Sequence, residues 1–401
     1  MIDDDSSDKL EEEKFDAALV DGAFFSKCFY LIPHRLQIPC ITIADIVDPH
    51  LVKAPWLPSF VPNPVWPLSD KMTFTDRLKN TVGSFFFTFI LPLYLPDPTD
   101  EVLEKFRRYG DFGSLDELQS RSALWLLVTD DVLDYPRPMM PNMVYVGGLT
   151  VKRSTGKLPT DIKNFIDGAE KGVVLVTFGS LVSSIPPHVV EKLSSAFARL
   201  DGYRVIWRLD NVDNLKLSDV MVSQWLPQSD ILAHPSVKLF VTHCGTNGQY
   251  EAVYHGVPMI GFPTFGNAFY NAVRADRKGY GVTMNLRDFT ADELVDNVRQ
   301  ILRDKSYTER VAKASEILRT QAQSPVERAT FWIEHVCRFG GDHLRSAGND
   351  LPVYSYLMMD VLAFIVTVPL IISYTLYTLL KIAMNKCRGR KASINSLKKK
   401  E

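Results

Sequence analysis

The 401-residue sequence lacks several patterns that would place it in a common class. Its five cysteines are scattered, with no C-x-x-C pair and no cysteine–histidine spacing typical of a zinc site. Its formal net charge of -2 argues against a nucleic-acid-binding role, which usually needs a concentrated basic surface. No repeat at the spacing of a solenoid is present. We therefore expect neither a bound metal nor a nucleic-acid partner.

The two ends of the chain differ in charge and hydropathy. Residues 1–14 are acidic and polar, which predicts a disordered leader and no secretory signal peptide. An uncharged apolar run begins at residue 361 and is long enough to cross a membrane. We predict a juxtamembrane segment over 336–360, a transmembrane helix over 361–383 and a basic tail over 384–401. A buried core helix is the alternative, although such helices rarely run this long without a charge.

The basic tail also predicts the orientation in the membrane. Lysine and arginine gather on the cytosolic side of membrane helices, so we expect a cytosolic tail and the main body on the other side. Insertion with the body in the cytosol remains the alternative, because no signal peptide is visible to direct translocation.

The order of predicted elements divides the main body in two. Residues 15–150 mix short apolar runs with prolines, and residues 50–70 are so rich in proline that they predict an irregular loop. A polar linker follows over 151–171, and the pattern is regular over 172–335. Strands are predicted in the first part at 15–21, 38–44, 123–130 and 143–149, and in the second part at 172–180, 203–209, 220–225, 237–244, 258–263 and 281–286.

The second part predicts an α/β domain. Its strands show no polar alternation, and amphipathic segments separate most of them. This pattern is typical of a parallel sheet covered by helices on both faces. Ligands of such sheets bind beyond the carboxyl ends of the strands.

One polar turn at that edge has features of a phosphate site. The stretch "HCGTNGQYE" follows a buried strand and leads directly into a helix. Gly245 and Gly248 allow a ligand to approach the backbone, and the free N–H groups of the helix N-terminus attract phosphate. His243 can donate to a phosphate oxygen, and Glu251 can accept hydrogen bonds from a diol such as ribose.

Two further loops reach the same edge. One ends in Gly179 and Ser180, and the other carries Trp225 and Gln228, which can stack on a base and bond to its edge or to the sugar. Taken singly, Trp225 could be a core residue, His243 a structural histidine and the Gly179–Ser180 pair an ordinary turn. Together they indicate a nucleoside diphosphate. A dehydrogenase is disfavoured, because "VTFGSLVSS" does not supply the G-x-G-x-x-G pattern.

Residues 225–274 resemble the donor-binding signature of the animal UDP-glycosyltransferases, the group of UDP-glucuronosyltransferases and UDP-glucosyltransferases. The segments "VYVGGL", "VLVTFGS" and "GGDHLRSAGNDLPVYSYLMMDVLAF" are similar to segments of the same family. The resemblance implies GT-B architecture, with two Rossmann-like domains facing a cleft: an incomplete acceptor-binding domain over 15–150 and a UDP-sugar-binding domain over 172–335. The closing "KKKE" resembles an endoplasmic-reticulum retrieval signal, with a merely basic end as the alternative.

The resemblance also implies residue roles. Trp225 would stack on uracil, Gln228 would hold the nucleoside and Glu251 would bind the ribose hydroxyls. The diphosphate would be held by Ser180, His243, Asn247 and Gly248. The reaction would be an inverting transfer of the sugar to a small lipophilic alcohol, phenol or acid. It would need no metal and no cofactor besides the UDP-sugar, and the family can form homo- or hetero-oligomers.

The sequence departs from the family in two places. Asp21 matches the aspartate that orients a catalytic histidine, but no histidine lies among the 20 residues before it. We therefore expect negligible transfer by the chain as written. A non-catalytic UDP-binding subunit that pairs with full-length transferases is the alternative. Asn267 and Ala268 stand where the family has an Asp-Gln pair that contacts the sugar, so glucuronic acid, glucose or another hexose remains open as the donor sugar.

Overall fold

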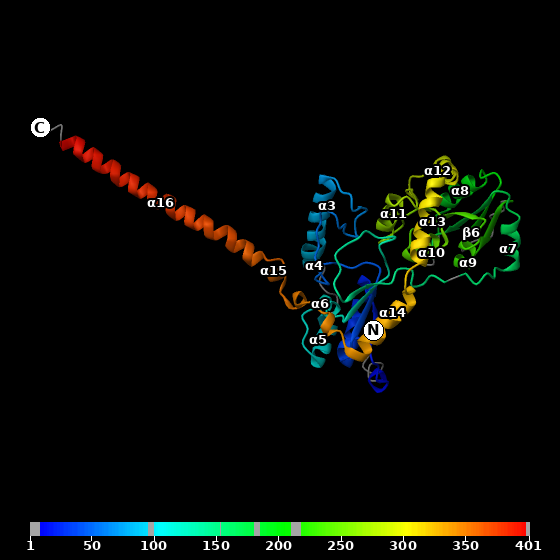
Figure 1. Cartoon of the computed structure of the whole chain (residues 1–401), viewed down its shortest axis with the longest axis horizontal. Coiled ribbons are helices and arrows are strands. Elements are labelled where there is room, and N and C mark those ends of the chain that lie inside the picture. Colours follow the sequence, from blue (N-terminus) through cyan, green and yellow to red (C-terminus); the bar gives the residue numbers. More distant parts are fainter. Residues whose placement is uncertain (1–8, 95–99, 153, 180–184, 210–217, 398–401) are drawn as a thin grey trace. The chain divides into compact units, whose positions relative to one another are not determined.

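The computed structural model describes residues 9–94, 100–152, 154–179, 185–209 and 218–397. The chain forms two compact units, residues 1–345 and 346–401. The first unit contains two separate parallel sheets, and the second consists mainly of one long helix (Figure 1).

The first sheet has four parallel strands in the order β1-β2-β3-β4. They are β1 Ala18–Asp21, β2 Cys40–Ala44, β3 Leu124–Leu127 and β4 Met143–Tyr145. All four strands predicted for this part of the chain are confirmed. Because Asp21 pairs with Ile43, the ends of β1 and β2 lie side by side, and the residues that follow them share one edge of the sheet.

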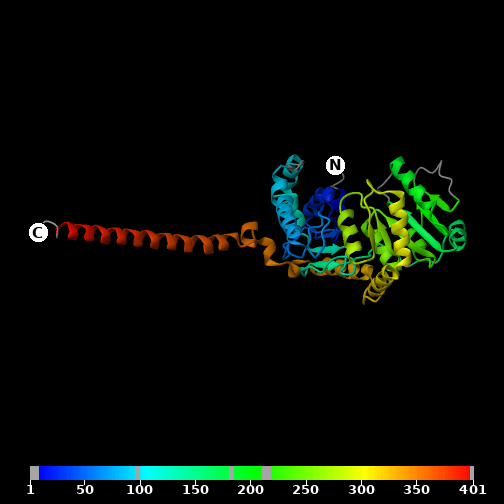
Figure 2. The ribbon, with the colours of Figure 1, turned by 90° about the horizontal axis from the view of Figure 1, so that it is seen from above.

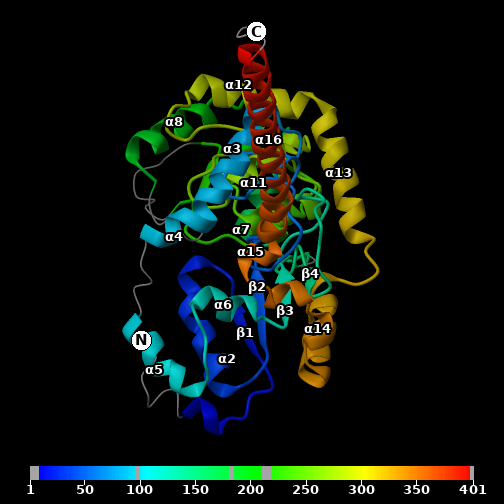
Figure 3. The ribbon, with the colours of Figure 1, turned by 90° about the vertical axis from the view of Figure 1, so that its left-hand side faces the viewer.

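Helices cover both faces of this sheet (Figure 3). Apolar residues of η1 Phe24–Tyr30, α2 Leu31–Leu36, α5 Asp100–Phe106 and α6 Leu115–Ser120 pack with Val20 of β1. On β2 and β3, Ile41, Leu124 and Leu126 pack with Ala329 and Val336 of α14 Pro325–Phe339. The sequence assigned most of α14 to the sugar-binding domain, but this helix covers the first sheet. Its two buried residues, seven positions apart, give no indication of which sheet they meet.

The second sheet has six parallel strands in the order β10-β9-β8-β5-β6-β7. The strands are β5 Gly172–Thr177, β6 Tyr203–Arg208, β7 Val220–Ser223, β8 Val237–Thr242, β9 Met259–Gly261 and β10 Gly281–Thr283. Each lies within a predicted strand. Two large apolar clusters, one on each face, pack the sheet against its helices, so the doubly wound prediction is confirmed.

The helices of this sheet also follow the sequence pattern. One cluster includes residues of α8 Pro187–Phe197 and α12 Ala291–Arg303. The other includes residues of α9 Gln228–Leu232, α10 Thr246–His255, α11 Ala268–Arg277 and α13 Lys305–Arg319. Thr290 begins α12 with a capping box, in which its hydroxyl accepts from Glu293 N and the Glu293 carboxylate accepts from Thr290 N.

Two segments predicted to be unstructured contain packed helix. In the predicted linker, α7 Thr160–Asp167 buries Ile162 and Ile166 in the core of the second sheet. In the predicted leader, residues 9–12 are helical, and Glu11 Oε1 lies 2.8 Å from Nε of Arg35, a mostly buried side chain. Both helices are short and mostly polar, so their composition indicated loop. The few contacts that hold them come from residues distant in sequence.

Buried charges connect the loop after β3 with helices of the second sheet. Asp134 accepts hydrogen bonds from Arg137 Nη2 at 2.8 Å and from the hydroxyl of Tyr270. Arg274 of α11 approaches the same carboxylate at 4.0 Å. Burial acts to raise the pKa of Asp134, but the two guanidiniums and the Tyr270 hydroxyl together hold this pKa below its ordinary value.

The second unit contains α15 Val353–Tyr356 and α16 Met359–Leu397, which includes Pro369. Residues Met359–Lys386 of α16 are long and apolar enough to cross a membrane. Figure 2 shows α16 from the side as one long helix, coloured orange to red. α16 is therefore a candidate membrane span, and the transmembrane helix predicted over 361–383 stays a prediction beside the core-helix alternative.

We predict that Asp134→Ala lowers the free energy of unfolding by about 3–5 kcal/mol at pH 7, because it leaves two buried guanidiniums without their shared acid. The pKa of Asp134 is lower in the folded state, so its contribution is present above about pH 4 and is lost as the pH falls through the folded value. The difference in the free energy of unfolding between variant and wild type should therefore become smaller at acidic pH. Urea unfolding of the detergent-solubilised chain measures both effects.

Asp131→Ala is the matched control for this measurement. Asp131 lies three residues away in the same loop and is exposed. Its loss should change the free energy of unfolding by less than about 0.5 kcal/mol. Equal losses in the two variants would contradict a special role for Asp134.

Candidate functional site

The predicted site residues lie at the carboxyl edge of the second sheet. The loop after β7 carries Trp225, the loop after β5 carries Gly179, and the loop after β8 carries His243. Asn267 follows β9. Because the strand order runs β9-β8-β5-β6-β7, these loops form a line from Asn267 at one end to Trp225 at the other. Four strand spacings make this line roughly 19 Å long.

The middle of the line is the N-terminus of α10. Gly245 is its N-cap and has no side chain to occupy the first N–H groups. Those N–H groups and the positive end of the helix dipole are therefore available to an anion.

His243 is held between two glycines. A Cβ on Gly245 would lie 2.5 Å from His243 Nε2, and a Cβ on Gly179 would also overlap the imidazole. Gly179 has a φ of +79°, which disfavours any side chain there. Burial lowers the pKa of His243, so the ring is neutral at neutral pH and carries one N–H donor. We therefore assign Gly179 and Gly245 to the packing of His243. For Gly245 this adds to its predicted role in backbone approach.

Gly248 differs from Gly245. A Cβ on Gly248 would meet Phe240 at 3.4 Å and Gln228 Nε2 at 3.6 Å, which are ordinary contacts. Packing within the protein therefore does not require glycine at position 248.

Gln228 and Glu251 form a pair beside α10. Gln228 begins α9, and its Nε2 donates a hydrogen bond to Glu251 Oε2. Burial raises the pKa of Glu251, while this hydrogen bond acts in the opposite direction. The pair presents a fixed carboxylate one helical turn from the N-terminus.

Trp225 is 70% exposed, so the alternative that it is a core tryptophan is wrong. The Ser223 hydroxyl donates to the carbonyl of Trp225 at 2.7 Å and fixes the backbone that carries the indole. A tryptophan exposed to this degree loses favourable burial, which is usual where its ring meets a ligand.

The remaining predicted residues have different surroundings. Asn247 Oδ1 accepts a hydrogen bond from Thr150 Oγ1 at 3.0 Å. Ser180 lies outside the described residues. Asp21 is exposed at the end of β1, and its Oδ1 accepts from Ala23 N at 2.8 Å.

Asn267 and Ala268, predicted together as sugar contacts, point to different places. Ala268 is 3% exposed and packs with Cys244 and Ala272, so its side chain does not reach the site. Asn267 Nδ2 lies 3.3 Å from Thr246 Oγ1 and 3.3 Å from Asp45 Oδ2.

Sequence reasoning did not select Asp45. This residue directly follows β2, as Asp21 ends β1, and an acid at the carboxyl end of a parallel strand was the available signal. What the sequence could not show is that Asp45 meets residues more than 200 positions away, at the second sheet.

We predict that Gly245→Ala lowers the free energy of unfolding by about 1–3 kcal/mol, because the new methyl group overlaps the His243 ring. Gly248→Ala is the matched control, on the same helix end but without an overlap, and should change stability by less than about 0.5 kcal/mol. Urea unfolding measures both. Equal stability of the two variants would show that His243 moves freely.

Comparisons with known proteins show which family the chain belongs to. The family model described as UDP-glucoronosyl and UDP-glucosyl transferase matches residues 1–393. The chain is 33% identical to UDP-glucuronosyltransferase 1-2 of Rattus norvegicus, over 96% of this chain and 72% of that protein. It is also 33% identical to UDP-glucuronosyltransferase 1A1 of Homo sapiens, over 97% of this chain and 73% of that protein.

Solved structures support the fold. The glycosyltransferase of kitacinnamycin superposes with a TM-score of 0.59 at 22% identity, over 81% of this chain and 76% of that one. A UDP-glucosyltransferase from Polygonum tinctorium superposes with a TM-score of 0.58 at 15% identity, over 83% and 80%. These similarities show the GT-B fold, and the sequence relatives show the family. The chain belongs to the UDP-glucuronosyltransferase and UDP-glucosyltransferase family.

Proposed function

We propose that this chain binds a UDP-hexose along the line from Trp225 to Asn267 and serves its inverting transfer to a small lipophilic acceptor. One observation carries the proposal: an exposed indole, a hydrogen-bonded Gln–Glu pair and an open helix N-terminus follow one another along a single sheet edge. A flat base, a ribose diol and a diphosphate need these three chemical groups in this order.

In this arrangement the uracil stacks on Trp225. The ribose hydroxyls donate to the Glu251 carboxylate, which Gln228 orients. The diphosphate accepts from the first N–H groups of α10 and from His243, with Asn247 beside them.

The same groups act on the reaction. When the bond between the sugar and UDP breaks, negative charge develops on the departing diphosphate. The N-terminus of α10 and the N–H of His243 are already in place to stabilise that charge. The UDP-sugar is the only co-substrate in this scheme, and treatment with EDTA should leave the binding of UDP unchanged.

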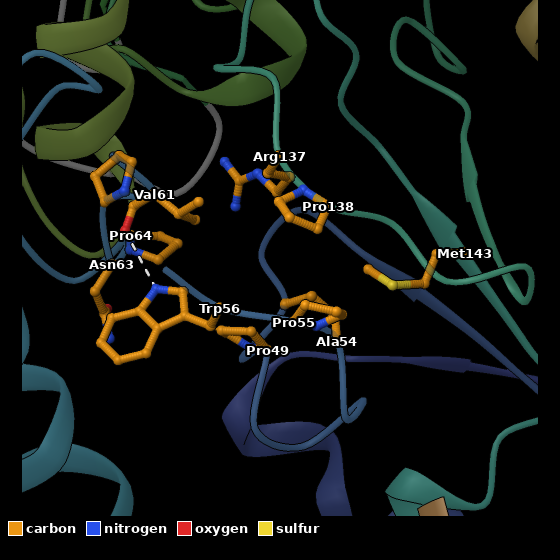
Figure 4. A pocket seen from close by; sticks show the side chains of 12 residues that line it. Pro49, Ala54, Pro55, Trp56, Val61, Asn63, Pro64, Arg137, Pro138 and Met143 are labelled. Atoms are coloured by element: carbon orange, nitrogen blue, oxygen red, sulfur yellow. Dashed lines mark hydrogen bonds between the residues drawn. The ribbon is translucent and has the colours of Figure 1, made fainter. Parts of the chain in front are cut away.

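The first sheet supplies the acceptor side. Asp21 is proposed as the acid that would orient a catalytic histidine, as the resemblance implies, although no histidine precedes it in this sequence. The first part of the chain contains a small apolar pocket (Figure 4). One of its lining residues, Val47, comes two residues after Asp45 in the sequence. Its lining includes Val47, Trp56, Val61 and Met143, with Arg137 among its polar residues. Apolar walls suit the lipophilic part of an alcohol, phenol or acid.

The loop that lines this pocket is the irregular, proline-rich segment predicted over 50–70. Its backbone is held by Asn80 of α3 Phe74–Phe85, whose Nδ2 donates to the carbonyls of Pro58 and Val61, each at 2.9 Å. The indole N–H of Trp56 also donates to the carbonyl of Val61, at 3.2 Å. These bonds stabilise a loop with few backbone N–H groups of its own.

We predict that Trp225→Ala weakens UDP binding by roughly 5- to 150-fold, the range given by losing one base-stacking contact. Isothermal titration of UDP into the purified full chain measures the affinity. The control is Phe331→Ala. This change also removes an exposed aromatic ring, in this case one on α14, and the variant should bind UDP like the wild type. No UDP binding by the wild type would overturn the proposed function.

A transfer assay with UDP-glucose, UDP-glucuronic acid and a phenol tests the reaction itself. Turnover that falls with the loss of UDP binding in Trp225→Ala supports the transferase. UDP binding without turnover supports the alternative, a UDP-binding subunit that acts together with other transferases.

We also propose that the chain lies in the endoplasmic-reticulum membrane through α16, with its main body in the lumen. The support is the basic tail that follows the candidate span. In sealed microsomes, protease added outside should remove the tail and spare the body until detergent opens the vesicles. Digestion of the body before detergent is added would indicate the opposite orientation.

A further inference from the structure

An acid of the first sheet stands at the end of the donor line. Asp45 Oδ2 accepts from Asn267 Nδ2 at 3.3 Å, and the carboxylate also bonds to the side chain of Thr246. Thr246 is the first residue of α10, and Asn267 is the N-cap of α11. The carboxylate therefore lies at the beginning of both helices, on the side of His243 that is opposite to Trp225 in the strand order.

The position of Asp45 along the line indicates which part of a UDP-sugar it would contact. On the proposed function, the uridine occupies the Trp225 end and the diphosphate occupies the N-terminus of α10. The hexose is the next group of a UDP-sugar, and the next polar side chains along the line are those of Asn267 and Asp45.

The charged groups near Asp45 disfavour a ligand that carries a carboxylate of its own. Arg274 is the nearby cation that acts on Asp45, but its side chain is 2% exposed and is shared between Asp134, at 4.0 Å, and Gln249, at 3.3 Å. Asp21, at the same edge of the first sheet, adds negative charge. A hexuronic acid would thus bring its own carboxylate toward Asp45 with the nearest guanidinium buried and already engaged.

We propose that Asp45 and Asn267 hold the hydroxyls of a neutral hexose and disfavour a hexuronic acid, so that the preferred donor is a UDP-hexose such as UDP-glucose. This inference rests on the proposed function. A carboxylate is a strong acceptor for sugar hydroxyls, whereas two like charges close together repel one another.

Equilibrium binding to the purified full chain tests the inference without requiring turnover. The probes are UDP, UDP-glucose and UDP-glucuronic acid, titrated at pH 7.5 and one salt concentration. The wild type should bind UDP-glucose at least about tenfold more tightly than UDP-glucuronic acid, since one charge–charge contact of this kind corresponds to a factor of that order. Asp45→Asn should reduce this ratio to about threefold or less, mainly through tighter binding of UDP-glucuronic acid, and should leave UDP affinity unchanged.

Asp48→Asn is the matched control. Asp48 is exposed on the same loop, and an asparagine can still accept from His50 N as the aspartate does. This variant should keep the wild-type ratio. If Asp45→Asn does not fold, Asp45→Ala removes the same charge. The ratio of the wild-type affinities for UDP-glucose and UDP-glucuronic acid also tests the inference without any variant.

The outcomes separate the two proposals. No binding of UDP by the wild type overturns the proposed function and this inference with it. Binding of UDP together with equal affinity for the two UDP-sugars overturns this inference alone. A preference for UDP-glucose that Asp45→Asn does not change also overturns it, because the discrimination would then come from other residues.

Discussion

The structure depends on one constraint: the six strands of the second sheet are parallel, so all of their carboxyl ends meet at one edge. In the described part of the chain, this edge brings together the site residues of four loops, those after β5, β7, β8 and β9. His243 is fixed there because Gly179 and Gly245 leave just enough room for its ring. With that ring in place, α10 begins with its N–H groups unobstructed, and the rest of the site is arranged on either side of this point.

The two sheets offer different chemical groups. The second sheet offers groups that suit a nucleotide: an indole, a Gln–Glu pair and a helix N-terminus. The first sheet contributes acids at the ends of β1 and β2 and the apolar pocket beyond them. The buried ion pairs and hydrogen bond of Asp134 with Arg137, Arg274 and Tyr270 connect the loop after β3 with α11 of the second sheet.

Local sequence patterns predicted a strand or helix well where its own residues carry a recognisable pattern. All ten strands were found, because buried parallel strands are continuous apolar runs bounded by polar loops. The pattern failed for α7 and α14. Ile162 and Ile166 look like isolated apolar residues in a polar stretch, and Ala329 and Val336 do not indicate which sheet they cover. These helices are stabilised by partners that are distant in sequence, which a local pattern does not contain.

The sequence alone determined the family and led to the proposed ligand, because the residues from Trp225 to Glu251 form a continuous motif whose spacing follows from one strand–helix unit. Only the tertiary structure decided which side chains are available. It buried Ala268, exposed Trp225 and placed Asp45 next to Asn267. The physical reason is that the exposure of these side chains and the contacts between the sheets depend on how the two sheets pack together. The spacing of residues along the chain gives no information about that packing.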